Sequence, residues 1–303
     1  MDKIFAGIIP PMLTPLTTDE RIDAPAVERL VNFLIGHGVH GLFILGSIGE
    51  GAFLRSAEKR KLAEATLAAA AGRVPVIAGV LECSTERVIE EMARLALPGI
   101  AAYVVTTPYY YGGFAPRDLR EHFRRVASAT DKPILAYNIP QNTHVAMKAE
   151  LMLDLASLPN IAGIKDSAGD RFEDQLLLLR QRPPGFAVFQ GNQGYAGVSL
   201  LAGADGLVPG HANIWPDLLV GMYDAALRKE VAAVWAAQAR LNDLMTLRAR
   251  APIHTFKVIA QALGLMGDSV TVPLPRLTAE EARQSIAAHA AIGLSLTELA
   301  VTG

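Results

Sequence analysis

A single lysine follows a short apolar run in residues 161–170, which read I-A-G-I-K-D-S-A-G-D. A run of this length, closed by small and polar residues, is typical of a buried parallel strand, so Lys165 is expected at its carboxyl end. Burial disfavours the charged ammonium and lowers its pKa, and the neutral amine is then a nucleophile toward carbonyl carbon. The alternative is a structural lysine whose charge is paired with Asp166 or another carboxylate.

A glycine-rich segment and a tyrosine also follow apolar runs. Residues 46–51 read G-S-I-G-E-G and precede a predicted helix, so their backbone N–H groups could hold an anion. The segment lacks the lysine and hydroxyl residue of a nucleotide-binding P-loop, which makes a carboxylate an equal candidate. Tyr137 ends a different apolar run, where a phenol either transfers protons or packs in the interior.

These groups together predict amine chemistry on a 2-keto acid. A neutral Lys165 would add to the ketone and lose water to form an iminium ion, which is an electron sink for carbon–carbon cleavage or for loss of water nearby. Ser47, with residues 46–49, is a candidate for holding the carboxylate, and Tyr137 is a candidate for carrying protons. Because the substrate would be held covalently on Lys165, no cofactor is expected.

Composition and charge argue against several other classes of protein. The net charge is −2 and no long basic run occurs, so neither nucleic acid nor an anionic membrane is an expected partner. The single cysteine excludes an internal disulfide framework, and the seven histidines form no cluster with ligand spacing, so no metal site is predicted. With 51% hydrophobic residues and no segment long enough to span a bilayer, a soluble cytoplasmic protein is expected.

Eight apolar runs alternate with segments of helical periodicity, and each run ends in a Gly, Pro or polar turn. This alternation predicts a (β/α)8 TIM barrel, because strict β–α order favours a parallel sheet and no G-x-G-x-x-G motif follows a strand. We expect the barrel at residues 1–225 and C-terminal helices packed on it at 226–303, with residues 218–303 helical throughout. In such a barrel, functional residues gather at the carboxyl ends of the strands.

The predicted strands lie at 7–12, 41–45, 75–80, 101–105, 133–137, a segment ending near Lys165, 186–190 and 204–208. The predicted helices lie at 24–36, from Ser56 onward with Ser56 as the N-cap, and at 85–96, 116–129, 151–158, 171–180 and 195–202.

Five motifs, taken together, resemble the dihydrodipicolinate synthase / N-acetylneuraminate lyase family of class I aldolases. They read G-S-I-G-E at 46–50, T-P-Y-Y at 107–110, Y-N-I-P at 137–140, G-I-K-D-S at 163–167 and L-L-A-G-A-D-G at 200–206. The motifs fall in the family's order and spacing, and the resemblance covers nearly the whole chain.

The resemblance implies a Schiff base between Lys165 and pyruvate or another 2-keto acid, with Tyr137 as the proton shuttle. Ser47 and the backbone N–H of Ile48 would hold the carboxylate of the keto acid. Tyr110 would join a relay with Ser47 and Tyr137, in many members from a neighbouring subunit. A homo-oligomer, either a dimer or a tetramer, is also implied.

The chain departs from the family's patterns where the second substrate is selected. Many members carry a hydroxyl residue at the position of Ile48. Asn142 stands where dihydrodipicolinate synthases carry an arginine, and a neutral amide cannot form the same bidentate, charged contact with a carboxylate. Sialic acid lyases carry acidic residues near Gln193 and Gly194, which are absent here. Neutral groups at Asn142, Gln193 and Asn213 fit a polyol or a short hydroxy acid instead.

Three further residues at strand ends are expected to contact the substrate. These are Ser167, Gly191 and His211, although His211 could equally be a packed histidine. Glu82 follows another predicted strand, and its role is left open.

We therefore expect a Schiff-base aldolase that cleaves or forms a carbon–carbon bond with pyruvate, on a 2-keto-3-deoxy sugar acid or a 4-hydroxy-2-oxoacid. A dehydratase of the same substrate class is the nearest alternative, and 4-hydroxy-tetrahydrodipicolinate synthase is the next. The remaining alternatives are a catalytically silent barrel that binds a keto acid as a sensor, and a metal-dependent aldolase.

Overall fold

The computed structural model describes residues 5–247 and 250–294, and its centre is an eight-stranded parallel sheet. The strand order is β1-β8-β7-β6-β5-β4-β3-β2, so from β2 to β8 each strand pairs with the next in the chain, and β1 pairs with β8. The strands are β1 (Gly7–Ile8), β2 (Leu42–Ile44), β3 (Val76–Val80), β4 (Ile100–Thr106), β5 (Ile134–Asn138), β6 (Ile161–Asp166), β7 (Ala187–Gln190) and β8 (Gly206–Leu207).

The chain just after β1 closes the sheet into a barrel. The backbone N–H of Phe43 donates to the carbonyl of Pro10 at 3.0 Å, and the N–H of Met12 donates to the carbonyl of Phe43 at 2.8 Å. Pro10 and Pro11 have no N–H to give, so β1 ends at Ile8 although the apolar run continues to Met12. The predicted (β/α)8 barrel is confirmed, with a first strand shorter than predicted.

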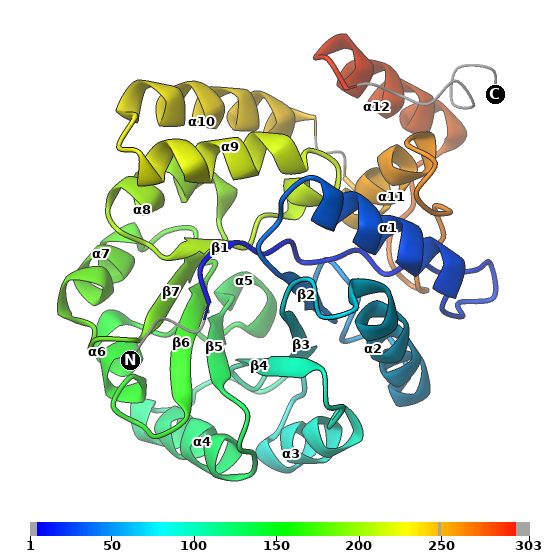
Figure 1. Cartoon of the computed structure of the whole chain (residues 1–303). Coiled ribbons are helices and arrows are strands. Elements are labelled where there is room, and N and C mark those ends of the chain that lie inside the picture. Colours follow the sequence, from blue (N-terminus) through cyan, green and yellow to red (C-terminus); the bar gives the residue numbers. More distant parts are fainter. Residues whose placement is uncertain (1–4, 248–249, 295–303) are drawn as a thin grey trace.

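Helices surround the strands, as Figure 1 shows. Within the described residues, no helix is long and apolar enough to cross a lipid bilayer. The helices are α1 (Ala24–Gly36), α2 (Ser56–Ala70), α3 (Thr85–Arg94), α4 (Pro116–Ser128), α5 (Pro140–Thr143), α6 (Ala149–Leu155), α7 (Phe172–Gln181), η1 (Gln193–Tyr195), α8 (Ala196–Leu201), η2 (Gly210–Asn213), α9 (Pro216–Leu227), α10 (Val231–Thr246), α11 (Pro252–Ala262) and α12 (Ala279–Ala291).

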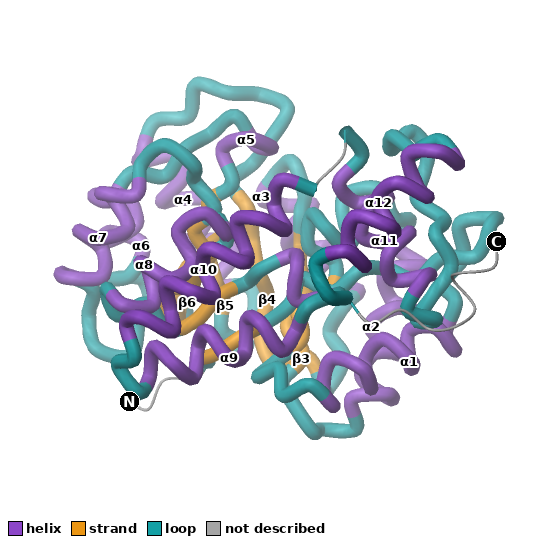
Figure 2. Tube along the Cα trace, turned by 90° about the horizontal axis from the view of Figure 1, so that it is seen from above, coloured by secondary structure: helices purple, strands orange, loops and turns teal. Residues whose placement is uncertain are grey.

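The C-terminal part is helical only in pieces. The prediction of continuous helix is wrong for residues 263–278, which lie between α11 and α12. Gly264 adopts a left-handed φ of 74°, which ends α11, and two prolines at 273 and 275 exclude regular helix further on. Figure 1 shows α11 beside α1 and α12 on the far side of α11, and Figure 2 shows α11 and α12 together. Arg29 of α1 donates to the carbonyl of Leu265, which follows α11. The division of the chain at residue 225 stays a prediction.

The inside of the barrel is filled by apolar side chains from alternate strand positions. Residues 163 and 165 of β6 face this interior, since a Cβ on Gly163 would lie 2.9 Å from the Leu135 side chain and the Lys165 amine lies over the rings of Phe43 and Tyr137. The inner cluster consists of Phe5, Ile9, Phe43, Ile77, Leu81, Ala102, Val104, Leu135, Tyr137, Ile139, Ala187, Phe189 and Val208.

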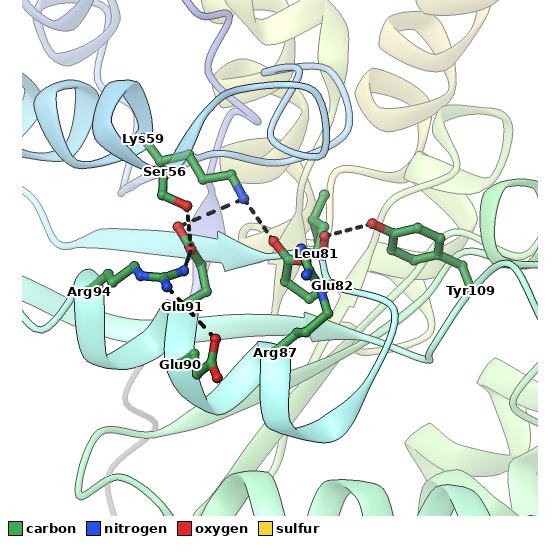
Figure 3. Close-up of polar contacts among 9 residues, drawn as sticks. All are labelled: Ser56, Lys59, Leu81, Glu82, Arg87, Glu90, Glu91, Arg94 and Tyr109. Atoms are coloured by element: carbon green, nitrogen blue, oxygen red, sulfur yellow. Dashed lines mark hydrogen bonds and ion pairs between the residues drawn. The ribbon is translucent and has the colours of Figure 1, made fainter.

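A second lysine is buried on the outside of the barrel, between α2, α3 and the end of β3 (Figure 3). Lys59, 4% exposed, lies 3.0 Å from Glu82 and 3.8 Å from Glu91, and both carboxylates are also buried. Ser56 is the first residue of α2 rather than its N-cap, and its hydroxyl donates to Glu91 at 2.9 Å. Glu82 therefore fastens the loop after β3 to the surrounding helices.

Replacing Lys59 with Met should lower the free energy of unfolding by about 3 kcal/mol, because two buried carboxylates lose their shared cation. The matched control is Arg60→Met, which breaks the exposed Arg60–Glu64 pair on the same helix and should cost less than about 1 kcal/mol. Urea denaturation of the three proteins measures both differences. Equal losses in the two variants would contradict this account of the network.

Candidate active site

A cavity of about 700 Å³ opens at the carboxyl ends of the strands. It is roofed on one side by α11 and by the segment between α11 and α12. Several residues predicted from the sequence line it together: Ser47, Ile48, Tyr137, Asn142, Lys165, Ser167, Gly191 and Gln193. The other lining residues are Pro11, Ile139, Gln141, Gly169, Asn192, Val208, Gly210, Met245, Pro252, Ile253, Phe256, Leu274 and Pro275.

The Lys165 amine faces aromatic rings rather than a carboxylate. The side chain is 5% exposed, and Nζ lies 3.8 Å from the ring centre of Tyr137 and 4.9 Å from that of Phe43. Asp166 is bound instead by the Asn138 amide at 2.9 Å and the N–H of Ala168 at 3.1 Å. Among the described residues no carboxylate forms an ion pair with Lys165, so the structural alternative of a Lys165–Asp166 pair is wrong.

Burial lowers the pKa of Lys165, against a smaller opposing effect of the neighbouring Tyr137 phenol. Burial also raises the pKa of Asp166 to about 6. Lys165 is therefore the group in this cavity whose neutral form is favoured by its surroundings, and a neutral amine is the form that attacks a carbonyl.

Space beside the amine depends on a glycine. A Cβ on Gly191 would lie 2.0 Å from the Ser167 hydroxyl and 3.0 Å from Cε of Lys165. Gly191 follows β7, and its N–H donates to the carbonyl of Asp166 at 2.7 Å, so the two strand ends are held side by side. Only glycine leaves Lys165 and Ser167 where they are.

The loop that carries Ser47 is anchored by a buried ion pair that sequence reasoning missed. Glu50 accepts from the N–H and the hydroxyl of Thr271 at 2.7 and 2.8 Å, and it pairs with Lys257 of α11. Lys257 is fully buried and also donates to the carbonyl of Ser269. These contacts fix the 46–51 loop to α11, which supplies Ile253 and Phe256 to the cavity wall. Glu50 and Lys257 are too far apart in the sequence for any local spacing pattern to predict that they pair.

A smaller cavity of about 370 Å³ adjoins the first and shares Ser47 and Asn142 with it. Tyr109 lines this second cavity, and its hydroxyl donates to the carbonyl of Leu81 at 3.2 Å (Figure 3). Tyr110 lines neither cavity: it is 82% exposed, with its ring 5.0 Å from that of Tyr111. One chain thus brings Ser47 and Tyr137 together but leaves Tyr110 on the surface.

Two residues proposed to face the substrate lie behind the cavity wall. His211 is fully buried, and its N–H and ring Nδ1 bond the side chain of Gln193. Asn213 is also fully buried, with its amide bonded to the N–H of Leu13 and the carbonyls of Pro11 and Gly210. The prediction that Asn213 faces a polyol is wrong, since these bonds occupy both ends of its amide.

No group of three His, Cys, Asp or Glu side chains within the described ranges could hold a metal ion. The polar lining residues are mostly neutral, and among those described Lys165 is the only charged one. The site therefore combines a desolvated amine, a phenol and a ring of hydroxyl and amide groups.

Replacing Lys165 with Met should stabilise the fold, because the wild-type protein must keep an amine out of water without a counter-ion. The folded pKa lies below the ordinary value of 10.5, so the unfolded chain binds more protons between the two values and wild-type stability rises with pH there. The gain from Lys165→Met should thus be larger at about pH 7 than at about pH 10. Urea midpoints at both pH values measure it, and a variant less stable at each would contradict this reasoning.

Known proteins share both this sequence and this architecture. The family model described as "Dihydrodipicolinate synthetase family" matches residues 4–292. A "4-hydroxy-tetrahydrodipicolinate synthase" of Stenotrophomonas maltophilia is 34% identical over 91% of this chain and 92% of its own length. A "Probable 2-dehydro-3-deoxy-D-pentonate aldolase YjhH" of Escherichia coli is 31% identical over 94% of this chain and 96% of its own length.

Among solved structures, YagE of Escherichia coli K12, a prophage protein crystallised in complex with pyruvate, superposes with a TM-score of 0.90 at 28% identity. The superposition covers 96% of this chain and 99% of YagE. The similarity extends over the barrel and the C-terminal helices together, as the resemblance of the five motifs predicted. This chain therefore belongs to the dihydrodipicolinate synthetase family.

Proposed function

We propose that the protein is a Schiff-base lyase that makes or breaks a carbon–carbon bond between pyruvate and an aldehyde, with a 2-keto-3-deoxy sugar acid or 4-hydroxy-2-oxoacid as the joined compound. The observation that carries the proposal is the Lys165 amine, 5% exposed, without a carboxylate partner among the described residues, at the base of a cavity of about 700 Å³. The pyruvate bound to YagE supports a keto acid as the substrate.

The chemistry follows from a neutral amine in this position. Lys165 adds to the C2 ketone to give a carbinolamine, which loses water to form an iminium ion. The C4 hydroxyl then gives up its proton, the C3–C4 bond breaks, and its electron pair moves toward the iminium to leave an enamine and an aldehyde. Protonation of C3 and hydrolysis release pyruvate and restore the amine.

Tyr137 and Ser47 are proposed for the remaining tasks. The Lys165 amine lies 3.8 Å from the ring centre of Tyr137, and this closeness supports a role for the phenol in carrying protons between the nitrogen and the substrate oxygens. Ser47 and the N–H of Ile48 lie on the loop anchored by Glu50 and are proposed to hold the keto acid's carboxylate. The reaction needs no cofactor, because the electron sink is formed on Lys165.

Tyr110 is proposed to act in the site of a second subunit, within a homodimer or homotetramer. Its side chain and that of Tyr111 are exposed in the single chain, at 82% and 74%, and Phe53 beside the second cavity is 50% exposed. Exposed aromatic residues gathered near a site are typical of an interface.

A mixture of the protein with pyruvate and sodium borohydride should give one reduced adduct, located on Lys165 by intact-mass spectrometry and peptide mapping. Lys165→Ala should give none, because no other amine of the cavity is desolvated in the same way. Urea denaturation of the variant checks that it is folded. A wild-type protein that is folded and forms no adduct would exclude the pyruvate lyase.

A second candidate, 4-hydroxy-tetrahydrodipicolinate synthase, is favoured by the name of the Stenotrophomonas relative. Its aldehyde, aspartate semialdehyde, carries a carboxylate and an ammonium group. Lys165 is the only charged residue among the described residues of the lining, and Asn142 stands in place of the expected arginine. A dehydratase would use the same iminium ion but expel a hydroxyl group instead of breaking a carbon–carbon bond.

Glyceraldehyde should therefore condense with pyruvate at a kcat/KM about tenfold or more above that for aspartate semialdehyde, since the carboxylate of the latter lacks a charge-assisted partner. Mass spectrometry of the products distinguishes the reactions, because a dehydratase gives a product lighter than its sugar-acid substrate by one water. A preference for aspartate semialdehyde would instead identify the synthase.

A further inference from the structure

Part of the cavity roof is a length of chain without helix or strand, residues 271–277, which we call the roof segment. It lies between α11 and α12, and its central residues Leu274 and Pro275 line the cavity. The N–H of Leu274 donates to the carbonyl of Thr271 at 2.9 Å, so the segment begins with a turn. Because no regular backbone pairing fixes the segment, its place over the cavity depends on contacts with other elements.

Buried side chains fasten the roof segment at both ends. At its start, the N–H and the hydroxyl of Thr271 donate to Glu50 at 2.7 and 2.8 Å. At its end, the N–H of Leu277 donates to Nδ1 of His254 on α11 at 2.8 Å. Glu50 is 1% exposed and His254 is 2% exposed. The two residues that line the cavity thus lie midway between two buried anchors.

Two further contacts of the roof segment lie at the surface. Glu20 accepts from the N–H of Val272 at 3.1 Å, and Arg250 donates to the carbonyl of Arg276 at 2.9 Å. Water can replace a lost partner at the surface, whereas a buried N–H that loses its acceptor stays unsatisfied. Loss of the His254 acceptor should therefore free the segment more than loss of either surface contact.

The protonation of the His254 ring follows from its partners. A backbone N–H can only donate, so Nδ1 accepts from Leu277 and carries no proton. The ring proton is then on Nε2, which lies 3.3 Å from a carboxylate oxygen of Asp268. His254 directly follows Ile253, which also lines the cavity. One ring therefore joins the α11 part of the cavity wall to the chain on both sides of the roof.

We propose that His254 is a positioning residue for the active site, which holds the roof segment in place by accepting the N–H of Leu277. The inference rests on the proposed function. Lys165 and the Ser47 loop are proposed to hold the keto acid, so the roof is left to meet the second reactant. A roof that is already in place lets the aldehyde bind without first ordering the segment, and the KM for the aldehyde is lower for that reason.

Two substitutions separate the two contacts of the ring. In His254→Asn the amide oxygen takes the place of Nδ1 and can accept from Leu277. In His254→Gln the longer side chain brings its amide to the place of Nε2, next to Asp268, and leaves the N–H of Leu277 without an acceptor. Asn is the weaker helix former of the two, so a general weakening of α11 would rank the variants in the opposite order.

For condensation of glyceraldehyde with pyruvate, His254→Gln should raise the KM for glyceraldehyde about tenfold, the factor that one lost buried hydrogen bond produces. Its kcat should change by less than about twofold, because the roof segment is proposed to affect binding rather than the reacting atoms. His254→Asn should restore the KM to within about threefold of the wild-type value.

Hydrogen–deuterium exchange read by mass spectrometry follows the roof segment without any substrate. Amides of residues 271–277 should exchange about tenfold faster in His254→Gln and near the wild-type rate in His254→Asn. Asp268→Ala, which removes the other partner of the ring at a half-buried position, should raise the KM for glyceraldehyde about threefold. It tests the same anchor should His254→Gln fail to fold, as judged by urea denaturation.

The matched control is His289→Gln, which replaces another buried histidine of the C-terminal helices. The His289 ring bonds the carbonyl of Ser285 within α12, so the KM for glyceraldehyde should stay near that of wild type. An equal rise in this control would show general destabilisation and overturn the inference. Equal KM values in His254→Gln and His254→Asn, or unchanged exchange of residues 271–277 in His254→Gln, would overturn it as well.

The borohydride adduct distinguishes failure of this inference from failure of the proposed function. Absence of the adduct in folded wild-type protein would overturn the lyase and the role of His254 in it. A Lys165 adduct in both wild type and His254→Gln, with an unchanged KM for glyceraldehyde, would overturn the role of His254 and leave the lyase standing.

Discussion

The burial of one amine without a counter-ion is the constraint on which the rest of the site depends. Lys165 lies between the rings of Tyr137 and Phe43, where desolvation lowers its pKa. Asp166, the nearest carboxylate in the sequence, is turned to Asn138 and Ala168 by the alternation of strand side chains. The (β/α)8 barrel makes this possible, because it places a strand end in a dry interior beside an open cavity.

The sequence predicted the barrel and a buried lysine at a strand end because both depend on local patterns. Helix α1 spans the predicted residues since Asp23 caps its first turn and Pro25 suits that turn. Lys165 was predicted because a lysine at the end of an apolar run is chemically unusual. The prediction of Ser56 as an N-cap was wrong, since its hydroxyl is drawn to Glu91 of the next helix. Local pattern cannot show that a better partner lies on another element.

The contacts that complete the site join residues far apart in the chain, and no spacing rule reaches them. Glu50 and Lys257 form a buried pair between the Ser47 loop and α11, and Gln193 is fixed by His211 across β7 and β8. The sequence indicated polar residues near the strand ends but not which of them line the cavity. Gln193 and His211 looked alike as strand-end polar residues, whereas burial separates the first as lining and the second as support.

The two walls of the cavity come from different parts of the chain. The strand ends supply Lys165, Tyr137 and the anchored Ser47 loop, which are the groups proposed to bind the keto acid. The opposite wall comes from α11 and from the segment before α12, through Ile253, Phe256 and Leu274. Because the Glu50–Lys257 pair ties this wall to the Ser47 loop, the aldehyde end can vary in its polar groups while the keto-acid end keeps its geometry. In the proposed function, the strand ends would carry out the chemical step, and lining residues such as Asn142 would select the aldehyde.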